Sequence, residues 1–488
     1  MLARALRSSL GLRWRPHAAF ISTADKGLYE LFSKHLERMG DNELNELSRA
    51  LGLPHGVSRA EAMHMIAKAG AKQQGTPRQS TEEKGDAPAP LEVDANGHAT
   101  VSTSWVKELT KSLSQHAAKG KAALGSSPIP KSVVMQVLQA SHKHQSSLPS
   151  LLRLSIPRKT SLNVCGDTHG QFFDLLNIFS SNVASWPSAE NRFLFNGDFV
   201  DRGVYSFEVA FTLLSMQLAS PESVHLLRGN HETTCMNRVY GFEAQVLAKY
   251  DSEVLDQFRK VFSSLPLAAV IEKKIFVVHG GIGPHTHKMA LDQIDALNRL
   301  RIDVAEERQG GVEEEEADVE AMGEFLWADP MPQKQENPSK SFIHNRARGA
   351  GWCFSPDATF SFLMRNNLSL LLRSHEAKAG GFNLDHEIAT ENKVYAPLRC
   401  ITVFSAANYC DSHGNLGALV RINRCDDGSV TGICGDQTSV IYGGRLKGTE
   451  SDIDYSLVQF TAVVHPNSGS RALKIVAQQQ DGWRSRTR

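Results

Sequence analysis

The sequence has few cysteines, and those it has are not grouped. Its 488 residues include seven cysteines, an odd number, and none of them forms a C-x-x-C pair. A disulfide framework requires paired cysteines and a zinc knuckle requires closely spaced ones, so the sequence predicts neither. A reducing compartment fits this pattern better.

The sequence also lacks an excess of either charge and any long apolar run. Basic and acidic residues number 53 each, so no overall field attracts nucleic acid or an anionic membrane surface. No apolar run approaches the roughly 20 residues that a membrane-spanning helix requires. We therefore expect no membrane span and no nucleic acid partner.

Acidic side chains are absent from the start of the chain, where the first one is Asp25. Four arginines precede it, and three leucines recur there at helical spacing. An amphipathic, arginine-rich, acid-free start is the composition of an organelle transit peptide, although a frayed basic tail has the same composition. We predict that residues 1–24 are a transit peptide for the mitochondrion, with the plastid or the cytoplasm as alternatives.

Composition divides the remainder into four parts. Leucine stripes over residues 28–70 predict a small helical module, which we expect to serve as a docking site for a partner. Its Leu51–Ala62 stretch is similar to the turn of SAP-type modules, a low-specificity match. Residues 71–103 are rich in Gln, Pro, Ser and Glu and predict a disordered linker. We expect one large domain over residues 104–475 and a C-terminal tail over residues 476–488.

In the large domain, short apolar runs alternate with helical stretches such as Gln171–Phe179 and Phe207–Leu218. This alternation is typical of the α/β class. A polar stretch at Glu306–Glu320 is expected to be a solvated insertion. The predicted strands are Leu162–Cys165, Arg192–Phe195, Val224–Leu227, Ile275–Val278, Leu368–Leu372 and Ile401–Phe404.

Five of these strands end in Asp, Asn or His, mostly beside glycine. A single Asp or His after a strand is usually a helix cap or a satisfied turn residue. Five such ends in one α/β domain instead predict a shared metal site, because functional residues gather beyond the carboxyl ends of strands. The five segments are G-D-T-H-G (166–170), G-D-F-V-D-R-G (197–203), R-G-N-H-E (228–232), H-G-G (279–281) and R-S-H-E (373–376).

The types of ligand restrict the metal. Carboxylate, amide oxygen and imidazole without thiolate suit manganese, iron or zinc. Six ligands are too many for one zinc ion and too few for an oxygen cage around calcium. Two ions about 3.5–4 Å apart can share a carboxylate and clamp both oxygens of an in-line displacement. We therefore expect two divalent metal ions per chain as cofactors.

In this order, the five motifs resemble those of the phosphoprotein phosphatase family of metallophosphoesterases, most of all its type-five serine/threonine branch. The resemblance covers roughly residues 104–475. It implies a metallophosphoesterase fold, in which a central β-sandwich of mixed sheets is flanked by helices. Further matches are M-N-R-V-Y-G-F (236–242), L-W-A-D-P (326–330), F-S-A-A-N-Y-C-D (404–411) and F-T-A-V-V-H-P-N (460–467).

The resemblance also implies a role for each site residue. Asp198 would bridge the two metal ions, and His231, paired with Asp201, would protonate the departing serine or threonine oxygen. Arg346 is an alternative to Arg348, because residues 341–352 align poorly. The first metal ion would be held by Asp167, His169 and Asp198, and the second by Asp198, Asn230, His279 and His375. The phosphoryl group would be held by Arg202, Asn230, Arg348 and Tyr409.

The implied activity is hydrolysis of phosphoserine and phosphothreonine in phosphoproteins by a hydroxide held between two metal ions. One alternative is a related metallophosphoesterase that cleaves dinucleoside polyphosphates. A pseudophosphatase scaffold is the non-enzymatic alternative, but every ligand position is filled. Ala407 stands where the family usually has proline, which weakens the expectation for Tyr409. We recognise no tetratricopeptide segment of the type-five branch, so we do not expect its autoinhibition.

Overall fold

The computed structural model of the chain divides it into two compact units. One unit comprises residues 1–79 and Arg346–Gly349, and the other comprises Ser80–Asn345 and Ala350–Arg488. The expected transit peptide and helical module lie outside the described residues. The structure describes residues 88, 91–93, 99–301, 313–331, 340–386, 400–425, 440–446 and 452–486.

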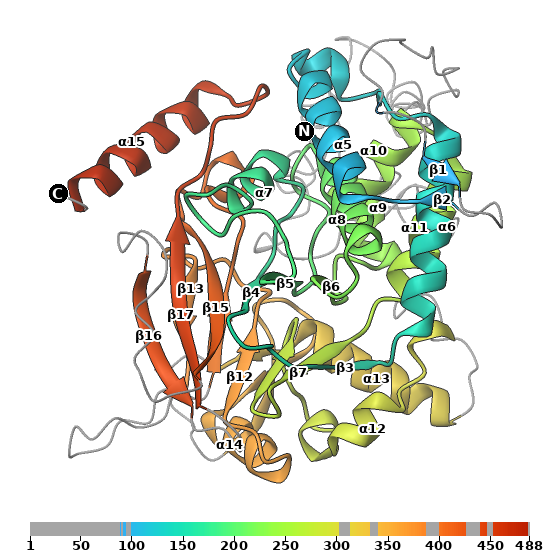
Figure 1. The fold of residues 1–488 in the computed structure, drawn as a ribbon. Helices are drawn as coiled ribbons and strands as arrows, with labels where there is room; N and C mark the ends of the chain where they lie inside the picture. The colour runs from blue at the N-terminus through green and yellow to red at the C-terminus, as the bar shows by residue number, and fades with distance from the viewer. Residues whose placement is uncertain are drawn as a thin grey trace, which may run out of the picture. The chain divides into compact units, whose positions relative to one another are not determined.

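Two six-stranded mixed sheets form the middle of the larger unit (Figure 1). The first has the order β16-β17-β15-β4-β5-β6, in which β4, β5 and β6 run parallel. The second has the order β13-β14-β12-β8-β7-β3, in which β8, β12 and β14 run parallel. The strands of the first sheet are β4 (Ser161–Cys165), β5 (Asn191–Phe195), β6 (Val224–Leu226), β15 (Gly417–Cys425), β16 (Val440–Leu446) and β17 (Asp452–Phe460). Those of the second sheet are β3 (Leu151–Leu154), β7 (Ala268–Ile271), β8 (Ile275–Val278), β12 (Leu370–Arg373), β13 (Phe382–Leu384) and β14 (Cys400–Val403).

The two sheets pack face to face through an apolar layer to which both contribute. Successive side chains of a strand point to opposite faces, so alternate residues of each strand enter this layer. In β5, Leu194 lies in the apolar layer between the sheets, whereas Phe193 and Phe195 lie on the outer side. In β8, Val277 lies between the sheets and Phe276 on the outer side. Both faces of each sheet are therefore buried, which explains the nearly continuous apolar runs in the sequence.

Helices cover the outer face of each sheet, which gives four layers in the order helix, sheet, sheet, helix. Helices α5–α8, α10 and α11 pack on the first sheet, and α12–α14 pack on the second. The predicted α/β class, with a sandwich of mixed sheets flanked by helices, is confirmed for this unit. The helices are α5 (Thr103–Ala117), α6 (Lys131–Ser147), α7 (Phe172–Ile178), α8 (Ser206–Ala219), α9 (Thr234–Tyr240), α10 (Phe242–Lys249), α11 (Ser252–Ser263), α12 (Leu291–Asp295), α13 (Glu313–Trp327), α14 (Pro356–Arg365) and α15 (Ser470–Arg486).

Side-chain caps fix where several of these helices begin. Asp251 Oδ1 accepts the Val254 N–H at 3.2 Å at the start of α11, which satisfies one of the free donors of the first turn.

A small third sheet follows α13 in the chain and precedes α14. It consists of β9 (Asp329–Pro330), β10 (Phe342–His344) and β11 (Trp352–Phe354). None of the helices in the described part of the chain combines the length and apolarity needed to cross a membrane.

Three segments are more ordered than the sequence predicts. The expected linker 71–103 contains a strand pair, β1 (Glu92–Val93) and β2 (Ala99–Thr100), with Leu91 and Val101 buried beside it. The expected tail 476–488 belongs largely to α15, which buries Val476 against the first helical layer. Neither segment has enough apolar residues to show a helix or strand pattern in the sequence. A single buried side chain can nevertheless anchor a segment, so both were predicted to be less ordered than they are.

The acidic stretch Glu306–Glu320 is also only partly an insertion. Helix α13 begins at Glu313, so the run Glu313–Glu316 opens a helix and does not form a loop. Met322 and Phe325 are buried later in the helix and hold it on the second sheet. Acidic residues are favoured in a first helical turn by the dipole, which explains how a charged run can start a buried helix.

Candidate metal centre

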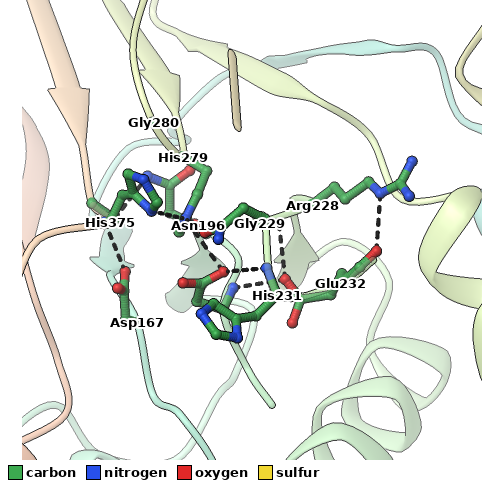
Figure 2. A network of polar contacts seen from close by, with 12 residues as sticks. Asp167, Asn196, Arg228, Gly229, His231, Glu232, His279, Gly280 and His375 are labelled. Atoms are coloured by element: carbon green, nitrogen blue, oxygen red, sulfur yellow. Dashed lines mark hydrogen bonds and ion pairs between the residues drawn. The ribbon is translucent and has the colours of Figure 1, made fainter. Parts of the chain in front are cut away.

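The predicted ligands come from strand ends that meet at one edge of the two sheets. The ligands directly follow β4, β5 and β6 of the first sheet and β8 and β12 of the second, and Figure 2 shows Asp167, His279 and His375 close together. A parallel bridge between Asp167 and Phe404 joins the two sheets at this edge. The His375 N–H donates to Asp167 Oδ1 at 3.0 Å across the same gap. Loops that are far apart in sequence are therefore held together by the strand topology.

Asp198 lies between two groups of donor atoms. Its Oδ2 is 3.5 Å from Nε2 of His169, which is also 3.7 Å from Oδ2 of Asp167. Its Oδ1 is 3.3 Å from Nε2 of His279. Among the described residues, two triads could hold an ion, one with His169, Asp198 and His231 and one with Asp198, His279 and His375. Asp198 belongs to both triads, which is the placement a bridging ligand requires.

Two backbone carbonyls fix the histidine tautomers. His169 Nδ1 is 3.0 Å from Val200 O, and His279 Nδ1 is 2.7 Å from Asn196 O. A carbonyl can only accept, so each Nδ1 carries the proton and each Nε2 offers a lone pair to the centre. Both rings are thereby oriented as metal ligands.

The surroundings of Asn230 test whether a cation fits. Asn230 Oδ1 is 3.0 Å from the lone pair of His279 Nε2. If the amide were turned, its nitrogen would face four acceptors at 2.9–3.2 Å, from His279, His375 and both oxygens of Asp198. An amide has two hydrogens and cannot satisfy four acceptors. A divalent cation satisfies all of them, so this set of donors fits a metal ion.

Charge leads to the same conclusion. Asp167 and Asp198 are each 1% exposed and lie side by side. Burial raises the pKa of Asp167 to about 7, and the charge of Asp198 adds to the effect. Burial lowers the pKa of His279, but the Asp198 charge outweighs it and raises the value to about 9, so the Nε2 lone pair becomes available only when a bound cation displaces the second proton of the ring. Two buried carboxylates require nearby positive charge, which two metal ions supply.

Unusual backbone conformations bring these side chains together. His169, Asp198 and His375 have positive φ values of 40°, 53° and 69°. Such strain gathers at functional sites, where the surrounding structure enforces it. A Cβ on Gly229 would lie 2.3 Å from Asp198 Oδ1, and one on Gly197 would lie 2.4 Å from Gly229 Cα. Glycine at both positions therefore lets the two ligand loops touch.

Glu232, which was not predicted as a site residue, organises the loop of Asp198. Its fully buried carboxylate accepts N–H bonds from Asp198 at 2.7 Å and from Phe199 and Gly229 at 2.8 Å. Burial raises its pKa to about 7, while these donors favour the ionised form. Arg228 Nε donates to Glu232 O at 3.1 Å (Figure 2). Its position in the R-G-N-H-E motif was the available signal, but its three partners lie mainly in another loop.

The predicted proton donor has its predicted partner. His231 Nδ1 lies 2.8 Å from Oδ2 of the buried Asp201, whose other oxygen accepts the Phe242 N–H at 2.9 Å. Burial lowers the pKa of His231, but the Asp198 charge and the Asp201 hydrogen bond raise it above 6.5. A histidine that holds its proton near neutral pH can act as a general acid.

Arg202 and Tyr409 lie at the rim of the centre. The exposed Arg202 guanidinium stacks on the ring of Tyr240, 3.6 Å from its centroid. The half-buried Tyr409 ring lies 5.0 Å from the His169 ring. The Tyr409 N–H donates to Asn415 Oδ1 at 2.9 Å, so the loop is held despite alanine at position 407.

Arg346 and Arg348, the two candidates for the second phosphate-binding arginine, do not belong to the larger unit. Arg346–Gly349 are grouped with residues 1–79 in the smaller unit, so the role of Arg348, with Arg346 as the alternative, stays a prediction. A further aromatic that was not predicted, Trp327, meets His375 edge-on at 5.7 Å. The structure thus brings together all six predicted ligands with His231 and Asp201.

Comparisons with known proteins extend these observations. Residues 161–379 match the family model described as calcineurin-like phosphoesterase. Serine/threonine-protein phosphatase 5 of Arabidopsis thaliana is 44% identical over 57% of this chain and 46% of its own length. The human protein of the same name is 39% identical over 68% of this chain and 55% of its own length. The chain therefore spans about half the length of these curated relatives.

One solved structure is matched over nearly its whole length. The protein serine/threonine phosphatase of Saccharomyces cerevisiae, described as similar to human phosphatase PP5, aligns with a TM-score of 0.55 and 31% identity. The alignment covers 70% of this chain and 92% of the yeast chain. With the motifs, the sandwich fold and the family match, this shows that the chain belongs to the calcineurin-like phosphoesterases, in the branch that resembles the type-five serine/threonine phosphatases.

Proposed function

We propose that this chain is a metal-dependent serine/threonine protein phosphatase that hydrolyses phosphoserine and phosphothreonine in proteins. The observation that carries the proposal is the convergence of six donor side chains, Asp198 among them, with the His231–Asp201 pair beside them. The relatives named above are protein phosphatases, which favours this activity over the cleavage of dinucleoside polyphosphates.

The chemistry requires strong assistance. Uncatalysed hydrolysis of phosphate monoesters is so slow that enzymes accelerate it by up to about 10²¹-fold. Two divalent ions at the centre would lower the pKa of a bound water towards about 7 and neutralise phosphoryl charge. Asp167, His169 and Asp198 would hold the first ion. Asp198 would share the second with Asn230, His279 and His375.

Three groups of the chain would handle the substrate. His231 would donate its proton to the departing serine or threonine oxygen, and Asp201 would keep that proton in place. Arg202 would bind phosphoryl oxygens through the N–H groups of its planar guanidinium, which stacks on the Tyr240 ring. Asn230, Tyr409 and Arg348 would complete the pocket around the phosphoryl group.

The finer identity of the cofactors and surroundings is also a proposal. Carboxylate, amide and imidazole donors favour manganese, iron or zinc in the two sites. The arginine-rich residues 1–24 support a mitochondrial location. Fusion of residues 1–30 to a fluorescent reporter tests this, and a diffuse cytosolic signal would refute it. Residues 28–70 are proposed to dock a partner protein.

The activity is tested directly with purified protein, a phosphoserine peptide and added Mn²⁺. We expect phosphate release that a chelator abolishes and that Mn²⁺ restores. A dinucleoside polyphosphate, assayed under the same conditions, is the matched control substrate. Cleavage of the dinucleotide without cleavage of the phosphopeptide would contradict the proposal.

A further inference from the structure

Asn196 is a buried polar residue at a position where the strand pattern calls for an apolar one. It directly follows β5, and alternation along the strand places it on the same face as Leu194, between the sheets. Its side chain has no exposed surface. An unbonded amide there would cost free energy, so the residue depends on its partners.

The amide nitrogen of Asn196 reaches the opposite sheet at two points. It donates to Val278 O at 2.9 Å and to Ser374 Oγ at 2.8 Å. Val278 immediately precedes His279, and Ser374 immediately precedes His375. Because the Val278 carbonyl can only accept, this bond fixes the orientation of the amide.

The backbone of Asn196 adds two further connections. Its carbonyl accepts the Nδ1 proton of His279 at 2.7 Å. Its N–H donates to Cys165 O at 2.9 Å, two residues before Asp167. Asp198 follows Asn196 by two residues. One residue is therefore bonded to the ends of β4, β8 and β12 and sits at the end of β5.

This position matters because the candidate centre is divided between the two sheets. Asp167 and Asp198 come from the first sheet, whereas His279 and His375 come from the second. Apolar packing between the sheets is non-directional. Two metal ions about 3.5–4 Å apart need ligands placed to within about 0.5 Å. Directional hydrogen bonds at the centre itself supply what the apolar layer cannot.

We propose that Asn196 is a positioning residue that sets the distance between the ligands of the two sheets, and thereby the affinity for the second metal ion. The inference rests on the proposed metal-dependent function. Without the amide, the His279 and His375 loops lose two of the hydrogen bonds that hold them at a fixed distance from Asp198. The first-sheet ligands Asp167 and His169 keep their mutual placement.

Asn196→Leu tests this, because it removes both amide bonds with little change in volume. Asn163→Leu is the matched control. Asn163 is also buried in the first sheet, and its amide bonds to Asn191 Oδ1 at 2.8 Å, away from the ligands. The measurements are titration calorimetry of Mn²⁺ into metal-free protein and the electron paramagnetic resonance spectrum of the bound pair, which reports exchange coupling between the ions.

We expect Asn196→Leu to raise the Kd of the more weakly bound Mn²⁺ by about 10- to 100-fold, as loss of outer-shell partners does elsewhere. The exchange-coupled signal should weaken in parallel. Asn163→Leu should melt at a lower temperature but bind two ions as the wild type does. Wild-type Mn²⁺ affinities and an unchanged spectrum in Asn196→Leu would overturn the proposal.

If Asn196→Leu does not fold, Ser374→Ala provides the test of the proposed positioning role. It removes one of the two acceptors and leaves the bond to Val278, so we expect about three- to tenfold weaker binding of the second ion. Unchanged binding in this variant would overturn the proposal. Wild-type protein that binds two Mn²⁺ ions but releases no phosphate from a phosphopeptide would instead refute the proposed activity and leave this inference standing.

Discussion

His231 is held by a buried carboxylate that has partners of its own. Its hydrogen bond to Asp201 is buried, and Asp201 is itself held by the Phe242 N–H and, at 3.4 Å, by the Asn237 amide. The carboxylate therefore cannot turn away, and Nδ1 of His231 keeps its proton. The proposed general-acid role requires this arrangement, because it leaves Nε2 to donate a proton.

Replacing His231 by asparagine tests its role as general acid. We expect His231→Asn to lower turnover of a phosphoserine peptide by at least about 100-fold. An aryl phosphate should suffer less, because its leaving group needs less protonation. Since the pKa of His231 is raised and its protonated form acts, wild-type activity should fall as pH rises above 6.5 through that pKa. Equal losses on both substrates would argue against the role.

Tyr240 was not predicted as a site residue, yet the Arg202 guanidinium stacks on its ring. A cation–π contact at an exposed site contributes about 0.5–1 kcal/mol, and the ring also restricts the side chain of Arg202. We expect Tyr240→Leu to raise KM for a phosphopeptide by about two- to fivefold, with a smaller change in kcat. Tyr240→Phe keeps the ring and should behave as the wild type. A KM in Tyr240→Leu equal to that of the wild type would show that the ring is dispensable.

At the scale of elements, α7 connects the centre to the C-terminal segment. Asp174 of α7 accepts the Val463 N–H at 2.9 Å and a bond from Gln171 at 2.7 Å. Gln171 also donates to Ala407 O at 2.6 Å, in the loop that carries Tyr409. One buried carboxyl thus supports both the segment after β17 and the rim of the site.

Burial raises the pKa of Asp174 from 3.8 to about 7, opposed by its hydrogen bonds and by nearby His465, while Asp411 adds to the rise. Its contribution to stability is therefore complete below pH 3.8 and is lost as pH rises through about 7. Asp174→Asn cannot ionise. Between pH 5 and 8, we expect its free energy of unfolding to gain on that of the wild type by up to about 3 kcal/mol.

Urea unfolding at several pH values measures this difference. Asp292→Asn is the control, because the Asp292 side chain is 95% exposed and its loss should leave the shape of the pH profile unchanged. Parallel profiles for Asp174→Asn and the wild type would contradict the effect of burial.

At the scale of the whole larger unit, the centre is a link between the two sheets. Its donors come from both sheets, and the buried carboxylates of Asp167 and Asp198 repel each other when no cation is bound. Metal binding should therefore stabilise the folded unit as well as activate it. At 100 times the Kd, each site contributes about 2.7 kcal/mol.

We accordingly expect Mn²⁺ to raise the melting temperature of the metal-free protein and a chelator to lower it again. Asp198→Ala should lose this response and its activity together, because Asp198 faces both groups of ligands. Asn163→Leu should keep both. A fully metallated, active Asp198→Ala protein would contradict the bridging assignment.

Much of the site could be predicted because its signals are local. A β-strand shows as a short apolar run, and the Asp, Asn or His that follows it stands a residue or two away in the chain. Strand β8 lies where it was expected, and β4, β5, β6, β12 and β14 differ by at most two residues at either end. Parallel strands then place Asp167 and Asp198 at one edge, and the family resemblance implied that His375 joins them.

The residues that hold the ligands could not be predicted in the same way. Glu232 bonds to groups 33 and 34 positions away, and Asn196 bonds to Ser374 across 178 positions. Tyr240, at the end of α9, supports Arg202 in the loop between β5 and α8. Nothing in the local pattern distinguishes these residues from ordinary polar or aromatic ones.

Neighbouring residues in the chain were enough to predict six strands of the two sheets, the polar residues that follow five of them and the types of metal ligand. The folded structure was needed to show which lone pairs converge, which carbonyl fixes each histidine and that α15 packs on the large domain. Those properties depend on distances between segments hundreds of residues apart, and only the packing of the two sheets sets these distances.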